Sequence, residues 1–137
     1  MMFTSKEALA EQEEAIRLKV RQLSDEQKKH FHRLTLKSIK DPDTYAVLNW
    51  CFIAGFHHFY LGKFIRGAVN LSLLILGLIL LFSIEPPWVG LGIYGLVFLL
   101  ELPQLLNAQN IIHQYNNQLM QACLVEVLGA SNDKPLA

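Results

Sequence analysis

The chain has 137 residues, enough for one domain of ordinary size. Apolar residues make up 52% of it and charged residues 18%, an apolar excess for so small a protein. The formal net charge is zero, so there is no overall electrostatic attraction to nucleic acid, which is not an expected partner.

Charge is distributed very unevenly along the chain. Nine of the twelve Lys and Arg residues precede residue 41, and the others are Lys63, Arg66 and Lys134. The middle of the chain is thus almost free of charge, as a membrane segment requires. We therefore expect an all-α integral membrane protein. Residues 6–40 contain no apolar run of the kind that a secretory signal peptide has, so we expect the N-terminal arm to be retained.

Residues 1–44 are expected to form an amphipathic helical arm. The segments Thr4–Glu7 and Ser24–Gln27 both have the spacing of a capping box, so each predicts a helix start. Pro42 predicts a helix end just before it. The apolar stripes are narrow, and two interpretations stay open: a solvated or loosely docked helical pair, or a partner-binding arm. The stripes consist of Leu9, Ile16, Val20, Leu23, Phe31 and Leu34, with Ile39 as a further candidate.

Three apolar segments follow within residues 45–106, at about 45–62, 64–84 and 88–106. The last two reach the length of roughly 20 residues that a membrane-spanning helix needs. Only Glu85, Pro86 and Pro87 separate them, which predicts a tight antiparallel hairpin. Small residues in this hairpin are candidate points of close helix packing, within one chain or between chains, at Gly77, Gly90, Gly92 and Gly95.

The topology of the first apolar segment is open. It reaches spanning length only by including Asn49 and two histidines. If it crosses, Lys63 and Arg66 lie on the side opposite the basic N-terminal arm. If it is re-entrant or interfacial, all twelve basic residues share one side, which fits the positive-inside rule better, although re-entrant backbone must then be shielded by protein or water.

Residues 107–129 are expected to form an amphipathic C-terminal helix. Gly129 suits a helix end, and residues 130–137 are expected to be disordered. Cys51 and Cys123 are far apart in sequence and are interpreted as reduced, structural residues. The apolar face is formed by Ile111, Ile112, Tyr115, Leu119, Cys123 and Val127, and the polar face by Gln114, Asn117, Gln118 and Gln121.

The most distinctive stretch is Gly55-Phe-His-His-Phe-Tyr-Leu-Gly62, followed by Gly67. It resembles the signature of the TM2 domain family, small membrane proteins named for a pair of transmembrane helices. The matching residues are Gly55, His57, Phe59, Tyr60, Gly62 and Gly67, while His58 stands where the family has arginine. Glu101 stands roughly where the family carries an acid late in its last helix. The segment from Leu78 to Val97 is longer than in the usual compact pair.

The resemblance implies an integral membrane module of residues 45–106 without a shared catalytic activity. The lack of a signal peptide and the small size are typical of a bacterial protein, so we expect a cytoplasmic (inner) membrane location. The sequence likewise gives no sign of a catalytic activity. It contains no phosphate-binding loop, nucleophile elbow or paired carboxylate with a histidine at useful spacing. We therefore expect no enzyme and no cofactor.

Glu101 is the leading candidate for a functional residue, because an ionisable group within a span usually faces a partner or a cavity. We expect an intramembrane ion pair between Glu101 and Arg66 or Lys63. No metal site is expected at His57 and His58, since adjacent histidines diverge on a helix and no acidic residue or cysteine lies near them in sequence.

The expected function is a multi-pass, membrane-anchored interaction or scaffold module. Its partners would be the lipid bilayer and either a cytoplasmic protein or further copies of the chain. The alternative is a small oligomeric channel or transporter accessory subunit in which Glu101 lies in a polar path.

Overall fold

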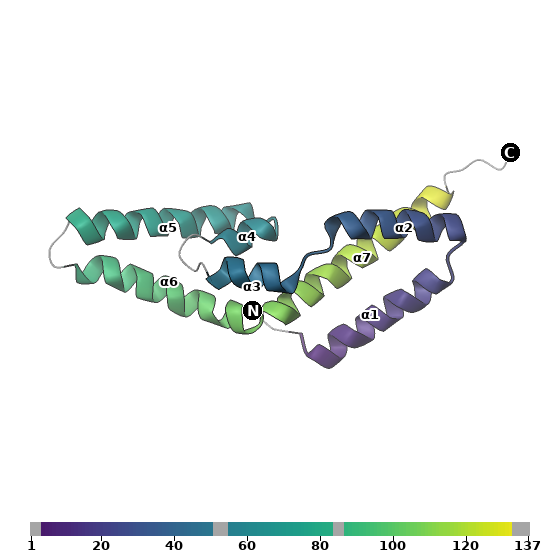
Figure 1. Ribbon diagram of the computed structural model, residues 1–137, viewed down its shortest axis with the longest axis horizontal. Coiled ribbons are helices and arrows are strands. Elements are labelled where there is room, and N and C mark those ends of the chain that lie inside the picture. Colours follow the sequence, from purple (N-terminus) through teal and green to yellow (C-terminus); the bar gives the residue numbers. More distant parts are fainter. Residues whose placement is uncertain (1–3, 51–54, 84–86, 133–137) are drawn as a thin grey trace. The chain divides into compact units, whose positions relative to one another are not determined.

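A computed structural model of the chain describes residues 4–50, 55–83 and 87–132, and the described residues form helices and no strand (Figure 1). The chain divides into two compact units, one formed by Met1–Asp41 with Asn110–Ala137 and the other by Pro42–Gln109. The helices are α1 (Lys6–Arg21), α2 (Asp25–Ser38), α3 (Pro42–Trp50), α4 (Phe56–Tyr60), α5 (Phe64–Ser83), α6 (Trp88–Leu106) and α7 (Ala108–Asn132). The expected all-α class is confirmed.

The first unit, which we call the polar unit, begins with two capped helices. The N-cap of α1 is Ser5, one residue later than expected, and its hydroxyl accepts a hydrogen bond from the backbone N–H of Ala8. The capping box at the start of α2 is confirmed. The Ser24 hydroxyl accepts from the N–H of Gln27, and the Gln27 side chain accepts from the N–H of Ser24. Each cap pairs backbone donors that a helix start leaves unpaired.

The N-terminal arm and the C-terminal helix share one hydrophobic core. It consists of Ile16, Leu23, Phe31, Cys123, Leu124 and Val127, with Val20, Leu34, Leu119 and Met120 packed against it. The stripes of α1 and α2 that are too narrow to form a core by themselves are therefore covered by α7. This favours the docked interpretation of the arm, and it joins segments about a hundred residues apart in sequence.

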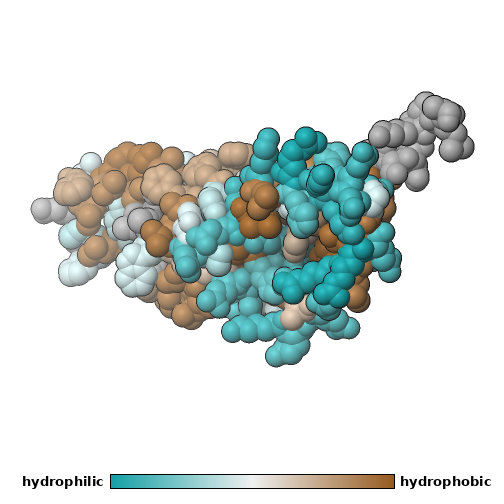
Figure 2. All heavy atoms as spheres, turned by 45° about the vertical axis from the view of Figure 1, so that its right-hand side comes forward, coloured by the Kyte–Doolittle hydropathy of each residue, from teal (hydrophilic) through white to brown (hydrophobic). Residues whose placement is uncertain are grey.

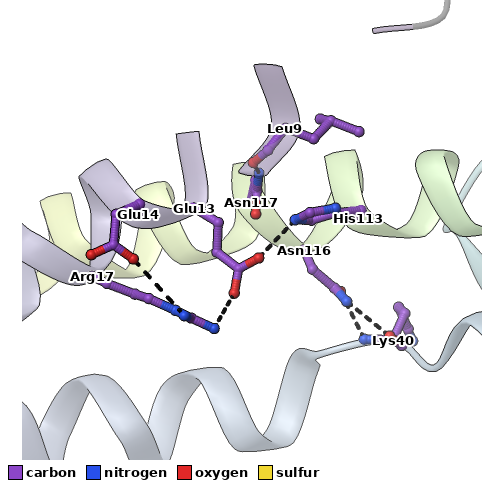
Figure 3. Close-up of polar contacts among 8 residues, drawn as sticks. All are labelled: Leu9, Glu13, Glu14, Arg17, Lys40, His113, Asn116 and Asn117. Atoms are coloured by element: carbon purple, nitrogen blue, oxygen red, sulfur yellow. Dashed lines mark hydrogen bonds and ion pairs between the residues drawn. The ribbon is translucent and has the colours of Figure 1, made fainter. Parts of the chain in front are cut away.

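Polar contacts connect α7 to the rest of this unit (Figure 3). The side chain of Asn117 is buried and donates a 2.8 Å hydrogen bond to the carbonyl of Leu9. Asn116 accepts from the N–H of Lys40 and donates to its carbonyl, both at 2.9 Å. Nε2 of His113 lies 2.8 Å from Oε2 of Glu13. Asn117, on the polar face that the sequence predicts for α7, is thus covered by α1.

The end of α7 differs from the expectation. The helix continues through Gly129 to Asn132, so glycine does not stop it. A glycine in a helix costs only about 1 kcal/mol relative to alanine and does not force an end.

The second unit, which we call the hairpin unit, contains the two longest apolar helices. In it α5 and α6 lie antiparallel and side by side, with α4 next to α5 and α3 next to α6 (Figure 1). Both α5 and α6 are long and apolar enough to cross a membrane, with only 11% and 17% of their apolar windows buried within the structure. In Figure 2, brown apolar atoms gather over these two helices and teal polar atoms over α1 and α2. The large apolar surface of α5 and α6 is therefore unlike that of a buried core helix.

A third membrane-spanning segment is not confirmed. The described residues of this region form two short helices, α3 of 9 residues, which begins at Pro42, and α4 of 5. Gly55 precedes α4 in a left-handed conformation, with φ 64°, which interrupts the helix there. At 1.5 Å per residue, α3 is only about 14 Å long.

The helices of the hairpin approach closely at one pair of glycines. A Cβ on Gly90 would lie 2.8 Å from the backbone nitrogen of Leu81 and 2.9 Å from the carbonyl oxygen of Gly77. Gly92 and Gly95 have no such neighbour among the described residues. Of the four glycines expected at packing points, Gly77 and Gly90 therefore lie where two helices of one chain pack closely together.

Three sequence-based expectations lie outside the described residues. They concern Cys51, the turn residues Glu85 and Pro86, and the tail from residue 133 onward.

Candidate functional site

The Gly55–Gly62 motif forms the short helix α4 and the two bends that bound it. Gly55 and Gly62 have φ values of 64° and 71°, a region that residues with a Cβ rarely adopt. Gly55 also lies against α5, because a Cβ there would be 2.7 Å from Cβ of Asn70. These bends allow α4 to lie beside the start of α5.

The aromatic part of the motif packs on the same helix. A Cβ on Gly67 would lie 2.7 Å from the ring of Phe59, so the absence of a side chain at Gly67 lets the ring contact the α5 backbone. Tyr60 is partly exposed, whereas His57 and His58 are buried. The motif thus turns its two histidines inward.

Both histidines meet Glu101 of α6. Nε2 of His57 lies 3.0 Å from Oε2 of Glu101, and Nε2 of His58 lies 3.4 Å from Oε1. The three residues are at most 5% exposed. Residues from two ends of the hairpin unit's sequence therefore form one enclosed polar cluster.

Two amides complete the surroundings of the carboxylate. Nδ2 of Asn70, on α5, donates to Oε1 of Glu101 at 2.7 Å. Nε2 of Gln104, one turn further along α6, donates to Oε2 at 2.6 Å. Each carboxylate oxygen therefore has one amide donor and one imidazole neighbour. Such a set of partners is what a carboxylate needs when it is removed from water. We call His57, His58, Asn70, Glu101 and Gln104 the Glu101 cluster.

Helix α3 adds buried polar groups beside the cluster. The rings of Tyr45 and His57 are arranged edge-on, with centroids 5.6 Å apart. Tyr45 and Asn49 are both fully buried and lie one turn apart on α3. Their side-chain polar atoms, and Nδ1 of both His57 and His58, have no hydrogen-bond partner among the described residues. Unpaired buried polar groups are uncommon in folded proteins and call for an explanation.

The structure gives Glu101 different partners from those expected. The sequence favoured pairing with Arg66 or Lys63, but in the described part of the chain the carboxylate is bonded to the cluster instead. Arg66 is exposed and Lys63 partly exposed near the start of α5. Both are therefore available to solvent or to a lipid headgroup region.

The expectation of no metal site at His57 and His58 also changes. It rested on the absence of an acidic residue near His57 and His58 in sequence, and the fold supplies Glu101. One ligand atom from each of the three residues can be chosen so that all lie within 4.8 Å of one another. The adjacent histidines do not diverge, because their ring centroids are 4.1 Å apart.

Sequence reasoning identified Glu101 and the histidines separately and missed their contact. One feature of the sequence could have predicted this contact. Asn70, Glu101 and Gln104 are rare polar groups within apolar helices, and such groups usually face one another inside the protein. In an antiparallel hairpin, Asn70 near the start of one helix and Glu101 near the end of the next lie at the same level.

Comparison with known proteins adds no relative. No family model, curated protein or solved structure matches this chain. The resemblance to the TM2 domain family thus rests on the motif residues alone.

Proposed function

We propose that this protein is a non-enzymatic, membrane-anchored interaction module of the TM2 type, located in a bacterial-type cytoplasmic membrane. The hairpin of α5 and α6 would be the anchor, and the polar unit would be the part that meets a partner. The observation that carries the proposal is the division of the chain into one unit with an exposed apolar hairpin and another with its own core and a polar exterior.

The exposed side chains of the hairpin support an anchor. Large apolar residues project from both helices along their whole length. Exposure of apolar surface to water costs about 25 cal/mol per Å², whereas a lipid tail solvates it. Among the most exposed are Phe64, Ile65, Phe82, Trp88, Leu99 and Leu100.

The short helices support a membrane topology with two crossings. A helix of 9 residues covers about half of the roughly 30 Å hydrocarbon core of a bilayer. We therefore propose that residues 45–62 are re-entrant or interfacial and do not cross. The N-terminal arm, Lys63, Arg66 and α7 would then all be cytoplasmic, in agreement with the positive-inside rule.

The anchoring step is tested by extraction of membranes with alkaline carbonate after expression in bacterial cells. We expect the protein to remain in the membrane pellet. An Ile75→Arg/Leu96→Arg variant, with both changes on exposed positions near the middle of the hairpin, should be lost from it, because each arginine costs about 3 kcal/mol at a helix centre. Leu36→Arg, at an exposed position of α2, is the control and should stay membrane-bound. Recovery of the unaltered protein in the soluble fraction would contradict the proposal.

The interaction step is tested with a photo-cross-linking residue at Leu36. Leu36 lines an open groove of about 540 Å³ in the polar unit, together with Ile16, Arg17, Phe31, Thr35 and Ile39. A discrete adduct with a cytoplasmic protein or a second copy, absent when the same residue replaces exposed Gln118, is the expected result. Equal, diffuse labelling from both positions would contradict a specific partner here.

The second candidate is a small oligomeric channel or transporter accessory subunit. It is favoured by one observation, the convergence of four polar side chains on Glu101 inside the hairpin unit. Ion or proton flux into vesicles that is lost in Glu101→Gln would support it. Flux equal to that of vesicles without the protein would contradict a channel and would favour the membrane-anchored interaction module.

A further inference from the structure

The Glu101 cluster has the composition of a metal centre. We propose that His57, His58 and Glu101 together bind one divalent first-row transition-metal ion, with Zn²⁺ as the ion to test first. Two imidazole nitrogens and a carboxylate oxygen form a common protein ligand set for zinc and for related ions such as cobalt and manganese. The site would leave one or more coordination positions for water or another ligand.

The distances suit coordination. Zinc bonds of about 2.0–2.1 Å in tetrahedral geometry place neighbouring donor atoms about 3.3 Å apart. The imidazole nitrogens lie 3.0 and 3.4 Å from the two carboxylate oxygens. One ligand atom from each of the three residues can be chosen within 4.8 Å of the others, so the side chains would have to close by up to about 1.5 Å around an ion.

The outer partners of the cluster also suit a metal. Ligating carboxylates are usually held by further hydrogen bonds, and Asn70 and Gln104 supply one to each oxygen of Glu101. These amides would keep the carboxylate oriented toward the histidines. They come from α5 and α6, so the carboxylate is fixed by both helices of the hairpin.

The unpaired ring nitrogens give a second, independent observation. A histidine that binds a metal through Nε2 carries its proton on Nδ1, which then donates to an oxygen acceptor. Nδ1 of both histidines is buried without a partner among the described residues. The Tyr45 hydroxyl and the Asn49 carbonyl oxygen are buried, equally unpartnered acceptors on α3, the helix that packs against α4. Metal binding at Nε2 would make Nδ1 of each histidine a donor, for which these are unpaired buried acceptors on the neighbouring helix.

A bound metal would have a defined structural effect. It would connect the short helix α4 to α6 by coordinate bonds, which would replace the hydrogen bonds that the same Nε2 atoms now make with Glu101. It would also supply positive charge to a buried carboxylate whose described neighbours are two imidazoles and two neutral amides. Binding should therefore stabilise the hairpin unit in particular.

The test uses the full chain, purified in detergent without a polyhistidine tag and stripped of metal with a chelator. Zinc is then added and measured by elemental analysis after removal of the excess. We expect one zinc ion per chain and a higher thermal midpoint. His57→Gln and Glu101→Gln each remove one of three ligands, so each should lower the zinc affinity by more than the roughly 10–100-fold that loss of an outer-shell partner costs. Matched controls are the double variant His30→Gln/His32→Gln and His113→Gln, which change histidines of the polar unit and should bind zinc as the unaltered chain does.

A measurement on the unaltered protein covers the case in which a variant does not fold. X-ray absorption of the zinc-loaded chain should show two imidazole ligands and a carboxylate oxygen at about 2.0–2.1 Å. Substoichiometric zinc, a spectrum without imidazole, or zinc lost only in the His30→Gln/His32→Gln or His113→Gln controls would overturn the proposal. The cluster would then be a hydrogen-bonded contact between α4 and α6 only.

Discussion

Nε2 of His57 lies 3.0 Å from Oε2 of Glu101, a residue 44 positions later in the chain. This contact joins the glycine-bounded helix α4 to the last third of α6. It gives the two histidines of the motif a structural reason to be buried, since they are among the few groups that can pair with the carboxylate. The Gly55–Gly62 motif and Glu101, the acidic residue late in the apolar helix α6, therefore form one polar cluster.

Replacing Glu101 by glutamine should destabilise the hairpin unit. The carboxylate accepts from Asn70 and Gln104, whereas a glutamine would have a single acceptor oxygen and would present an N–H₂ group to one of these donors. Hydrogen bonds to a charged group contribute about 1.5–3 kcal/mol, so we expect a loss of about 2–3 kcal/mol. Thermal unfolding in detergent, with chelator present to remove any metal effect, measures it. Glu126→Gln, at an exposed position of α7, should change stability little, and equal midpoints for both variants would contradict the structural role of the cluster.

Replacing Gly90 by alanine should weaken the hairpin. The new Cβ would meet backbone atoms of Leu81 and Gly77 at less than 3.0 Å, and backbone cannot yield as a flexible side chain can. We expect a loss of about 1–3 kcal/mol, as for other overpacked positions. Gly92→Ala is the matched control in the same helix, because open space surrounds it, and it should be neutral or slightly stabilising. Equal effects of the two changes on the thermal midpoint would mean that α5 and α6 do not approach as described.

Replacing Asn117 by alanine should loosen α1 from α7. The change removes the 2.8 Å hydrogen bond to the carbonyl of Leu9, which then has only its bond within α1, at a cost of about 0.5–1.5 kcal/mol. Amide hydrogen exchange of α1 should accelerate, since α1 depends on this contact and on a small core. Gln118→Ala, at the neighbouring exposed position, should leave the exchange unchanged. Unaltered protection of α1 in Asn117→Ala would contradict the docking of the N-terminal arm.

The thiol of Cys123 should make stability depend on pH in the alkaline range. Burial, and secondarily the nearby Glu126, raises the pKa of this thiol, so the unfolded chain loses the proton first as pH increases. The stabilising effect of the neutral buried thiol is therefore fully present below about pH 8.5 and declines as pH rises toward the folded-state pKa. In a Cys51→Ser background, the denaturation midpoint should fall more between pH 8 and pH 10 than it does after the further change Cys123→Ala. Parallel pH dependences of the two proteins would contradict a buried, neutral thiol.

The helical class and most helix starts were predictable from the sequence, because they depend on local rules. The capping box at Ser24 and the apolar stripe through Ile16 and Phe31 follow from spacing within one or two turns. The N-cap at Ser5 was predicted one residue too early, since adjacent Thr4 and Ser5 are both good caps and only the structure distinguishes them.

The candidate site was predictable only in part. The sequence predicted Glu101 as a functional residue because charge within an apolar helix is costly. The sequence favoured Lys63 or Arg66 as its partner over the two histidines, although all four were close enough in a hairpin. The choice depends on the bends at Gly55 and Gly62, which turn His57 and His58 toward α6. A bend of this kind alters side-chain direction over several residues, and periodicity does not reveal it.

The most direct test of the account is the side of the membrane on which Lys63 lies. Single cysteines at Lys63, Glu85 and Gln118 are introduced into a chain with Cys51 and Cys123 replaced by serine, and intact cells are treated with a membrane-impermeant thiol reagent. The two-crossing anchor predicts labelling of the Glu85 probe alone, with Lys63 and Gln118 labelled only after the cells are opened. Labelling of the Lys63 probe from outside would mean three crossings, which would place the N-terminal arm and α7 on opposite sides and contradict both the anchor topology and the shared core of α1, α2 and α7.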